Sequence, residues 1–551
     1  MKRFFLCAAI CAVSAVSVFS QAVAMQDKFP PTAYSEMEPL KQASPQEWKD
    51  VRRVQVSWGD IDTRYSKTSV PMHGVTRRIS LSAWRGERVF AQAVVWTRKP
   101  VKKLNFSVSD LKGPGRHRIS SESVRAGFVR YVMGDGFFSN GTGCGNWVNE
   151  SHRDTVFVAD CIDHHLASME MKPMTAQGIW LTCSVPSSVK PGIYKGRLVV
   201  RDGRRIIRRL KISIDVKEQV LPGPEDWSFH LDLWQNPYAV ARYHQVEPWS
   251  DDHMELMRPL MTMLAEAGQK VITATLIYKP WGGQTQDHFD SMVDWVKKSD
   301  GTWEYGFDIF DKWVSFMMDC GVTEQINCYS MVPWHSSFRY FDEASGKYAY
   351  VNASVGTKEY ETFWSGMLKE FEKHLKEKGW FDICTIAMDE RSLEAMQEVI
   401  RITREVSPDF KLSLAGNYHP EIECEIYDYC LAYRLAFPDD VLARRKAEGK
   451  ISTYYTCCTE QAPNLFTISD PADGLFLGLE MARRKSDGYL RWAYNSWPLD
   501  PLTDSRFRSF TSGDTYLVYP DARTSIRFER LIQGIQEYEK IRLSAPHLRN
   551  R

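Results

Sequence analysis

The sequence lacks the features that define several protein classes. Its 70 lysine and arginine residues nearly balance its 69 aspartate and glutamate residues, and the net charge of +1 argues against nucleic-acid binding through bulk electrostatics. Beyond the N-terminus no uninterrupted apolar run approaches the length of a transmembrane segment. None of the 12 cysteines forms a C-x-x-C pair with metal-ligand spacing. We therefore expect no metal site and no cofactor.

The N-terminus carries the pattern of a secretory signal. Two basic residues precede an apolar run over residues 4–19, and Ala22-Val23-Ala24 supplies a small-residue cleavage pattern. We therefore predict a signal peptide over residues 1–24 and an exported protein, either periplasmic or secreted. In an oxidising compartment some cysteines can form disulfides. Cys144 and Cys161 are the best candidates, because both lie in one polar, loop-like region.

Residues 25–220 are predicted to form an N-terminal accessory domain with an all-β sandwich fold. Short runs of alternating apolar and polar residues indicate half-buried antiparallel strands. These runs are Val54–Trp58, Arg88–Trp96, Leu104–Val108, Gly178–Val185, Tyr194–Arg201 and Ile206–Val216. The segment Leu221-Pro222-Gly223-Pro224 then marks a linker, beyond which the pattern changes.

Residues 225–551 are predicted to form a catalytic domain in which strands alternate with helices. The candidate strands are Ser228–Trp234, Val271–Ile277, Gln325–Val332, Ile383–Asp389, Leu412–Asn417, Tyr427–Tyr433, Ser452–Cys457 and Tyr489–Asn495. The amphipathic stretches are His253–Ala267, Phe307–Cys320, Glu359–Lys378 and Leu393–Val406, with a final helix over Thr524–Leu543. This alternation predicts an α/β fold with a parallel sheet, and eight strands predict a (β/α)8 TIM-type barrel.

Two adjacent carboxylates follow the fourth predicted barrel strand. The apolar run that starts at Cys384 ends abruptly on Asp389 and Glu390. Because burying two neighbouring charges is costly, we expect this strand to open onto a wet cleft. Two such groups can titrate differently and leave one ionised and one protonated, which is the division that acid–base attack on a glycosidic bond requires. The alternative is an Asp that caps a helix, followed by a Glu in its first turn.

Aromatic and polar residues recur where the other predicted barrel strands end. Strand ends of a barrel face one mouth, and indole faces together with amide and hydroxyl groups suit a sugar ligand. We single out as candidate substrate contacts Trp334, Tyr418, Tyr455, Trp492, Asn495 and Trp497. Each has a structural alternative, since a Trp can cover the core and an Asn can bond the local backbone. Asp514, in the loop after the eighth strand, could either bind a sugar hydroxyl or make an Asp turn.

These residues carry a resemblance to a known family. The region from about 228 to 543 resembles the catalytic domain of glycoside hydrolase family 123, whose known members are exo-acting β-N-acetylgalactosaminidases. The β-rich N-terminal part is similar to the accessory sandwich domain of that family. The segments that match are 386–391, 488–497, 513–520 and 525–530 in the catalytic part and 192–196 in the sandwich.

The resemblance implies hydrolysis with retention, assisted by the substrate. The 2-acetamido carbonyl of the sugar attacks C1 and forms an oxazolinium-type intermediate, so the protein supplies no nucleophile. Asp389 would orient the acetamido N–H, and Glu390 would act as the acid and then the base. The implied partner is a glycan or glycolipid with terminal β-GalNAc. The alternatives are a hexosaminidase of other sugar preference, a non-catalytic carbohydrate-binding protein on a degenerate barrel, and a structural protein. The sequence gives no signal for an oligomeric state.

Overall fold

The computed structural model describes residues 28–137, 155–508 and 510–548. The predicted signal peptide and Cys144 therefore lie outside the described residues. Cys161 is a free, buried thiol, so the predicted pairing of Cys144 with Cys161 is wrong, whereas Cys458 is disulfide-bonded. Within the described ranges, no helix has both the length and the apolar character needed to span a membrane.

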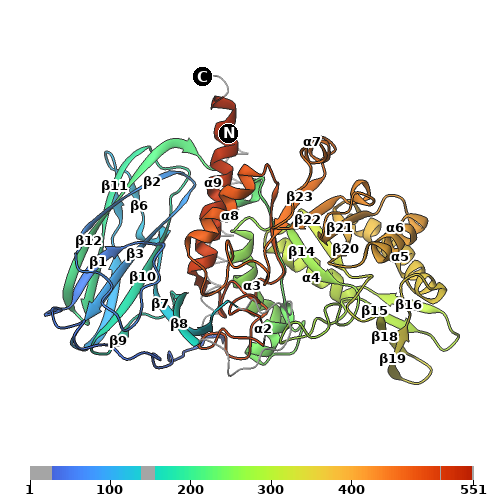
Figure 1. The fold of residues 1–551 in the computed structure, drawn as a ribbon, viewed down its shortest axis with the longest axis horizontal. Coiled ribbons are helices and arrows are strands. Elements are labelled where there is room, and N and C mark those ends of the chain that lie inside the picture. Colours follow the sequence, from blue (N-terminus) through green and yellow to red (C-terminus); the bar gives the residue numbers. More distant parts are fainter. Residues whose placement is uncertain (1–27, 138–154, 509, 549–551) are drawn as a thin grey trace, which may run out of the picture.

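The N-terminal part is a sandwich of two β-sheets (Figure 1). The first sheet has the order β1 (Gln55–Gly59), β3 (Arg88–Thr97), β10 (Thr175–Ser184), β7 (Val124–Asp135), β8 (Thr155–Asp163) and β25 (Thr524–Ser525). The second has the order β2 (Arg78–Arg85), β12 (Arg205–Val220), β11 (Gly192–Asp202), β4 (Val101–Val108) and β9 (Met169–Met171), extended by β5 (Leu111–Lys112) and β6 (Arg118–Ile119). All six strands predicted from the sequence are present, although their ends shift.

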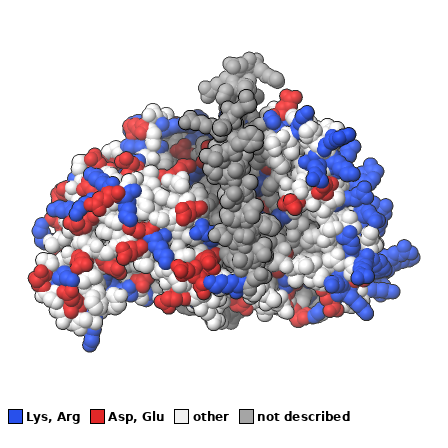
Figure 2. Space-filling model, turned by 180° about the vertical axis from the view of Figure 1, so that it is seen from behind, with Lys and Arg blue, Asp and Glu red and all other residues white. Residues whose placement is uncertain are grey.

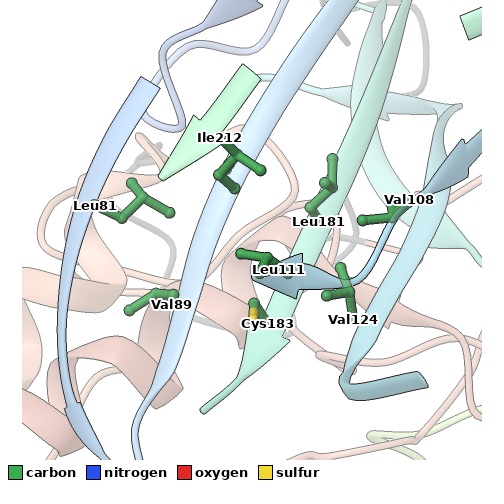
Figure 3. A pocket seen from close by; sticks show the side chains of 9 residues that line it. Leu81, Val89, Val108, Leu111, Val124, Leu181, Cys183 and Ile212 are labelled. Atoms are coloured by element: carbon green, nitrogen blue, oxygen red, sulfur yellow. The ribbon is translucent and has the colours of Figure 1, made fainter. Parts of the chain in front are cut away.

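Apolar side chains from both sheets meet between them and form the sandwich core. Figure 3 shows Leu81, Val89, Leu181 and Ile212 around a small gap in this core, whose lining carries no charged side chain. Alternation along the strands produces this layer, because every second residue faces the opposite sheet. The gap is a packing space of the core and offers no group that could perform chemistry.

The C-terminal part confirms the predicted barrel. Eight parallel strands follow one another in the order β13 (His230–Leu233), β24 (Gly488–Arg491), β23 (Ile451–Tyr455), β22 (Asp428–Ala432), β21 (Lys411–Gly416), β20 (Cys384–Met388), β17 (Gln325–Tyr329) and β14 (Val271–Thr275). The Lys270 N–H donates to the Leu231 carbonyl at 3.0 Å, which brings the first and last strands together. The barrel is therefore nearly closed. The domain boundaries at 25–220 and 225–551 stay predictions.

Helices surround the barrel and link it to the sandwich. They are α2 (Pro237–His244), α3 (Asp251–Ala265), α4 (Asp308–Asp319), α5 (Lys358–Lys378), α6 (Leu393–Val406), α7 (Asp439–Ala447), α8 (Ala472–Arg483) and α9 (Ile526–Leu548). Helix α9 runs between the two parts (Figure 1). Its Glu529 accepts a hydrogen bond from Thr182 of β10, and its Glu539 accepts one from the Phe229 N–H ahead of β13.

A small sheet that the sequence analysis did not predict projects beside the barrel. It has the order β16 (Trp303–Gly306), β15 (Asp294–Lys297), β18 (Ser337–Asp342) and β19 (Lys347–Asn352). Its strands lie in the connections that follow β14 and β17 (Figure 1). These connections start at the carboxyl ends of barrel strands, where barrels carry their functional loops.

The barrel interior is polar in its middle and aromatic toward the carboxyl ends of the strands. Side chains alternate along β20, so Ile386 and Met388 join the apolar core under the helices while Thr385 and Ala387 face inward. Thr385 bonds Asn327 and Ser413 of the neighbouring strands, at 2.7 and 2.9 Å. Higher up, the inward residues Trp234, Tyr329, Ala387, Ala415, Ala432 and Tyr455 form a separate cluster.

Candidate active site

A cavity of about 710 Å³, part of which is open to solvent, lies at the carboxyl ends of the barrel strands. It is lined by Trp234, Trp281, Gln284, Trp334, Asp389, Glu390, Ala415, Tyr455, Cys457, Cys458, Leu490, Trp492 and Phe510. Five of the residues singled out from the sequence therefore meet in one cavity: Trp334, Asp389, Glu390, Tyr455 and Trp492.

Asp389 is the buried member of the carboxylate pair. It occupies the inward position that follows Ala387 on β20, and only 8% of its surface is exposed. Its Oδ1 lies 3.1 Å from Arg391 Nη2, yet it accepts no hydrogen bond from the described residues. Burial raises the pKa of Asp389 to about 6, against the opposing charge of Arg391 and with a contribution from Glu390. Asp389 therefore remains mostly ionised at neutral pH but gains its proton in mild acid.

Glu390 is exposed and points along the same cavity. The Tyr455 hydroxyl, from the end of β23, donates a hydrogen bond to Glu390 Oε1. Burial, the charge of Glu390 and this hydrogen bond together raise the pKa of Tyr455, so the phenol stays a donor. Gly416 at the end of β21 leaves room beside Glu390, because a Cβ built there would lie 3.6 Å from Glu390 Cα.

The helix-cap alternative for the carboxylate pair is wrong. Helix α6 begins at Leu393, and the Ser392 hydroxyl accepts the capping hydrogen bond from the Ala395 N–H at 3.3 Å. Asp389 and Glu390 therefore precede the cap and belong to the loop that opens onto the cavity. Arg391 lies between the pair and the cap, and its Nε donates to the Val332 carbonyl at 2.8 Å.

Two tryptophan rings, packed against Tyr329, form the floor of the cavity beside Asp389. Trp234 stacks on Trp281 with ring centroids 4.9 Å apart, and Tyr329 lies 4.6 Å from Trp234. The indole N–H groups of both tryptophans are buried and donate to no acceptor among the described residues. Buried donors of this kind are normally satisfied. The Trp281 indole opposes the rise that burial causes in the pKa of the Asp389 carboxyl, whereas the Trp234 indole acts in the same way on the pKa of Asp232.

Trp334 and Trp492 line the cavity in different ways. Trp334 is 48% exposed, and the Arg391 guanidinium lies 4.6 Å from its ring centroid. Trp492 is half-buried, its ring lies 5.2 Å from that of Phe510, and its Nε1 donates to Asp514 Oδ1 at 3.2 Å. Both aromatic faces are available for stacking on an apolar ligand surface.

Asp514 acts on the cavity through a neighbour. It is fully buried and accepts a hydrogen bond from Arg491 Nη2 at 2.8 Å, in an ion pair in which neither side chain is exposed. Burial raises the pKa of Asp514, and the Arg491 charge opposes that rise. Asp514 thus fixes the indole of Trp492 and does not itself line the cavity.

The sandwich holds the loop that carries Asp514. Asp135, at the end of β7, accepts hydrogen bonds from the Ser512 N–H and hydroxyl. Asp160 of β8 pairs with Arg527 at 3.0 Å, and Arg527 Nη1 donates to backbone carbonyls on both sides of Asp514. Strand β25, which continues this loop, pairs with β8. Part of the active-site wall is therefore supported by the N-terminal domain.

Besides Asp514, three of the predicted contact residues do not line the cavity. Tyr418 stacks against Tyr429 with ring centroids 6.2 Å apart. Asn495 is fully buried and exchanges two hydrogen bonds with the backbone of Asn236. Trp497 is 1% exposed, and its Nε1 donates to the Val518 carbonyl. Asn495 and Trp497 therefore contribute to the core and bond the backbone, and the substrate contacts predicted for all three residues stay predictions.

Residues that the sequence analysis left out complete the site. Trp234, Trp281, Gln284 and Phe510 line the cavity, and Arg391 contacts both Asp389 and Trp334. Trp234 and Trp281 stood at predicted strand ends, which is the signal that could have singled them out. Among the described residues, no group of three or more His, Cys, Asp or Glu side chains is placed to hold a metal ion.

Comparison with known families decides the identity of the chain. A family model for the glycoside hydrolase 123 catalytic domain matches residues 234–544, and one for the glycoside hydrolase 123 N-terminal domain matches residues 58–202. The chain belongs to glycoside hydrolase family 123. The predicted resemblance is therefore confirmed, and the chain is a glycoside hydrolase of this family.

One solved structure agrees with this family 123 assignment. A family 123 glycoside hydrolase from Clostridium perfringens, studied for glycolipid glycan hydrolysis, is 26% identical, with a TM-score of 0.81 and 90% of each chain covered. A family 39 glycoside hydrolase from Bacteroides cellulosilyticus is 11% identical, with a TM-score of 0.34 and coverage of 83% of this chain and 81% of that one. The latter similarity is too low to support any argument. No curated protein matches the chain.

Proposed function

We propose that this family 123 enzyme is an exo-acting, retaining β-N-acetylgalactosaminidase that removes terminal β-GalNAc from glycans or glycolipids. The observation that carries the proposal is the unequal environment of the two carboxylates. Asp389 is buried above the tryptophan floor, whereas Glu390 is exposed in the same cavity. The glycolipid glycan hydrolysis described for the Clostridium perfringens enzyme supports the choice of substrate class.

In the proposed first step the substrate supplies the nucleophile. The 2-acetamido carbonyl oxygen attacks C1, the bond from C1 to the leaving oxygen breaks, and Glu390 donates its proton to that oxygen. Asp389 accepts a hydrogen bond from the acetamido N–H and stabilises the positive charge that develops on the group. The unsatisfied Oδ1 of Asp389 supports this role, because a buried acceptor of this kind needs a donor.

The proposed second step returns the enzyme to its starting state. Glu390, now ionised, takes a proton from a water molecule that attacks C1 and opens the oxazolinium ring. The sugar is released with its original anomeric configuration, because two displacements at C1 cancel. Tyr455 holds Glu390 in place in both steps through its hydroxyl. Arg391 beside Asp389 keeps that carboxylate ionised at neutral pH.

Hydrolysis of nitrophenyl β-GalNAc and nitrophenyl β-GlcNAc, with Glu390→Gln in parallel, tests the proposal. Release from the galacto substrate alone, lost in the variant, would support the sugar and the role of Glu390 together. Release from the gluco substrate would favour a hexosaminidase of other preference. If natural glycans bind without being cleaved, the chain is a carbohydrate-binding protein and the proposal is wrong.

A second experiment tests the absence of a protein nucleophile. The experiment adds azide to the Asp389→Ala variant. If Asp389 were the nucleophile, as in a conventional retaining enzyme, azide would enter the vacated site and yield a glycosyl azide. Because we assign the nucleophile to the substrate, we expect no such product. Its formation would show that Asp389 attacks the sugar directly, and substrate assistance would then be rejected.

We also propose that the protein is exported after cleavage near Ala24. Residues 1–24 combine basic residues, an apolar run and a small-residue cleavage pattern, which supports this destination. N-terminal sequencing of the protein recovered from periplasm or medium should begin near Met25. An intact Met1 on protein found only in the cytoplasm would contradict the proposal.

A further inference from the structure

The outward face of the second sandwich sheet carries cations in register. Arg78 of β2 pairs with Lys211 of β12, and Lys211 pairs with Arg197 of β11, so three exposed cations stand side by side across three strands. In the next rows Lys195 faces Lys112 of β5. Figure 2 shows Lys and Arg side chains gathered along this sandwich end of the molecule.

This arrangement destabilises the folded sheet. Like charges placed directly opposite each other on neighbouring strands repel, because their side chains lie about 5 Å apart. The chain as a whole has a net charge of only +1, so the concentration is local. Uncharged residues are accommodated on the same two strands, where Ser80 pairs with Ser213. Because the cations repel one another at positions of this kind, we infer that they serve a purpose other than stability.

Acidic neighbours do not compensate the row. Asp202 pairs with Arg205 at 3.5 Å and Asp215 pairs with Lys217 at 2.5 Å, so these two acidic side chains already have partners. The remaining acidic residue of β12, Glu218, lies near the end of the strand, beyond the row. The three cations of the row, Arg78, Arg197 and Lys211, and the pair Lys112 and Lys195 form no ion pair with any residue that the structure describes. Their charges are available to an external anion.

The face lacks the features of a sugar-binding platform. Its outward positions on β11 and β12 hold mostly cations, with serine, aliphatic residues and the paired Asp215, and no aromatic ring. The aliphatic Ile193 and Ile206 are 53% and 39% exposed at its border. A broad cationic face with a few exposed aliphatic side chains is the combination that binds an anionic lipid surface.

We propose that this face docks the enzyme on an anionic membrane surface, through phosphate-bearing lipid headgroups. Charge complementarity supplies the attraction, and the row of Arg78, Arg197 and Lys211 is its centre. Headgroup phosphates between these cations would remove their mutual repulsion. This proposal does not rest on the sugar specificity of the active site, and it adds a binding surface on a domain that performs no chemistry.

Co-sedimentation of the chain from Met25 to Arg551 with lipid vesicles tests the proposal. We expect binding to phosphatidylcholine vesicles that contain phosphatidylglycerol, none to pure phosphatidylcholine, and loss of binding at high salt. The variant Arg78→Glu/Arg197→Glu/Lys211→Glu should bind the anionic vesicles at least about 100-fold more weakly. It again carries three like charges in register, so its thermal stability should match that of the parent.

A matched control changes the same charge elsewhere. Lys369→Glu/Lys373→Glu/Lys446→Glu alters exposed lysines on α5 and α7 and should leave vesicle binding within about twofold of the parent. The variant Arg78→Gln/Arg197→Gln/Lys211→Gln should bind anionic vesicles more weakly than the parent, because three cations are lost. It should also have higher thermal stability, because the repulsion between the three side chains is removed.

Three results would overturn the proposal. The first is equal binding of anionic vesicles by the parent and by the variants of the Arg78 row. The second is an equal loss in the α5 and α7 control, which would make the effect one of net charge. The third is binding of a sulfated polysaccharide with no binding of anionic vesicles, which would assign the face to a polymer. Glycosidase activity on a soluble substrate should be unchanged in all variants, which separates this test from that of the active site.

Discussion

Replacing Asp389 with Asn is expected to stabilise the protein while removing its activity. The carboxylate is 8% exposed, and burial holds its pKa at about 6 instead of the ordinary 3.8. The folded state therefore binds this proton more tightly than the unfolded state does. Stability falls as the pH rises from about 4 to about 6, and at pH 7 the full cost of ionising Asp389 inside the protein is present.

The magnitude follows from the two pKa values. A rise from 3.8 to about 6 corresponds to about 3 kcal/mol of destabilisation at pH 7. Asn has nearly the same shape and carries no charge, and its Oδ1 can keep the contact with Arg391. Because the amide group is itself polar and buried, we expect an observed gain of about 1–3 kcal/mol at pH 7. Below pH 4 Asp389 is protonated in both states, and the gain should vanish.

Thermal unfolding of the parent and of Asp389→Asn at pH 7 and at pH 4 measures this difference. We expect a Tm higher by about 2–4 °C at pH 7 and nearly equal values at pH 4. Glu390→Gln is the matched control, because it makes the same chemical change at the adjacent but exposed residue. It should change stability by less than about 0.5 kcal/mol at either pH, although both variants lose activity.

Two results would refute this reasoning. If Asp389→Asn were no more stable than the parent at pH 7, the burial cost assigned to the carboxylate would be absent. If the gain were the same at pH 4 and pH 7, it would come from packing and not from charge. An equal gain in Glu390→Gln would likewise remove the distinction between the two carboxylates on which the proposed mechanism depends.

Three further perturbations test other parts of the site. The acid limb of kcat/KM should lie near pH 6, where Asp389 gains its proton, and Arg391→Gln should move that limb to higher pH by about one pH unit, as read from a pH–rate profile. Arg491→Leu should lower the free energy of unfolding by about 3–5 kcal/mol in denaturant titration, because it leaves Asp514 buried without its cation. Trp334→Ala should raise KM up to about tenfold with Tm unchanged, since this ring is 48% exposed and supports no core.

The barrel strands were predictable because each is a short apolar run between amphipathic stretches. All eight are present, from β13 to β24, with ends that shift by a few residues. The fourth of them, β20, ends at Met388, and the predicted carboxylates follow directly. Hydrophobic periodicity and the alternation of strands and helices can be read along the chain, so the residues at the mouth of the barrel could be predicted from the sequence.

The predicted contact residues that lie away from the cavity have environments set by distant parts of the chain. Asn495 and Trp497 stand near the end of the eighth strand, but a turn of the following segment directs them to the Asn236 backbone and to Val518. Asp514 lies after the same strand and is withdrawn from the cavity by Arg491. Sequence position gives the end of the strand at which a residue lies, and tertiary packing decides which way its side chain points.

The four-stranded sheet beside the barrel was missed for a different reason. Strands β18 and β19 contain alternating aromatic and polar residues, but they lie inside a connection between a strand and a helix. Because we expected one helix after each barrel strand, we interpreted these segments as loops. Strand β19 also lacks the buried apolar face that identifies a core strand, because its Tyr348 and Tyr350 are exposed.

The small inward residues of the upper barrel explain why a cavity exists at all. Ala387, Ala415 and Ala432 face inward from β20, β21 and β22, where Trp234, Tyr329 and Tyr455 face inward from other strands. Interiors are otherwise close-packed, so a small inward side chain leaves space, and Ala415 is the one of these three alanines that lines the cavity. Asp389 and Glu390 follow one of these alanine strands. The same inward alternation that fills most barrels therefore leaves room for a ligand beside the carboxylate pair.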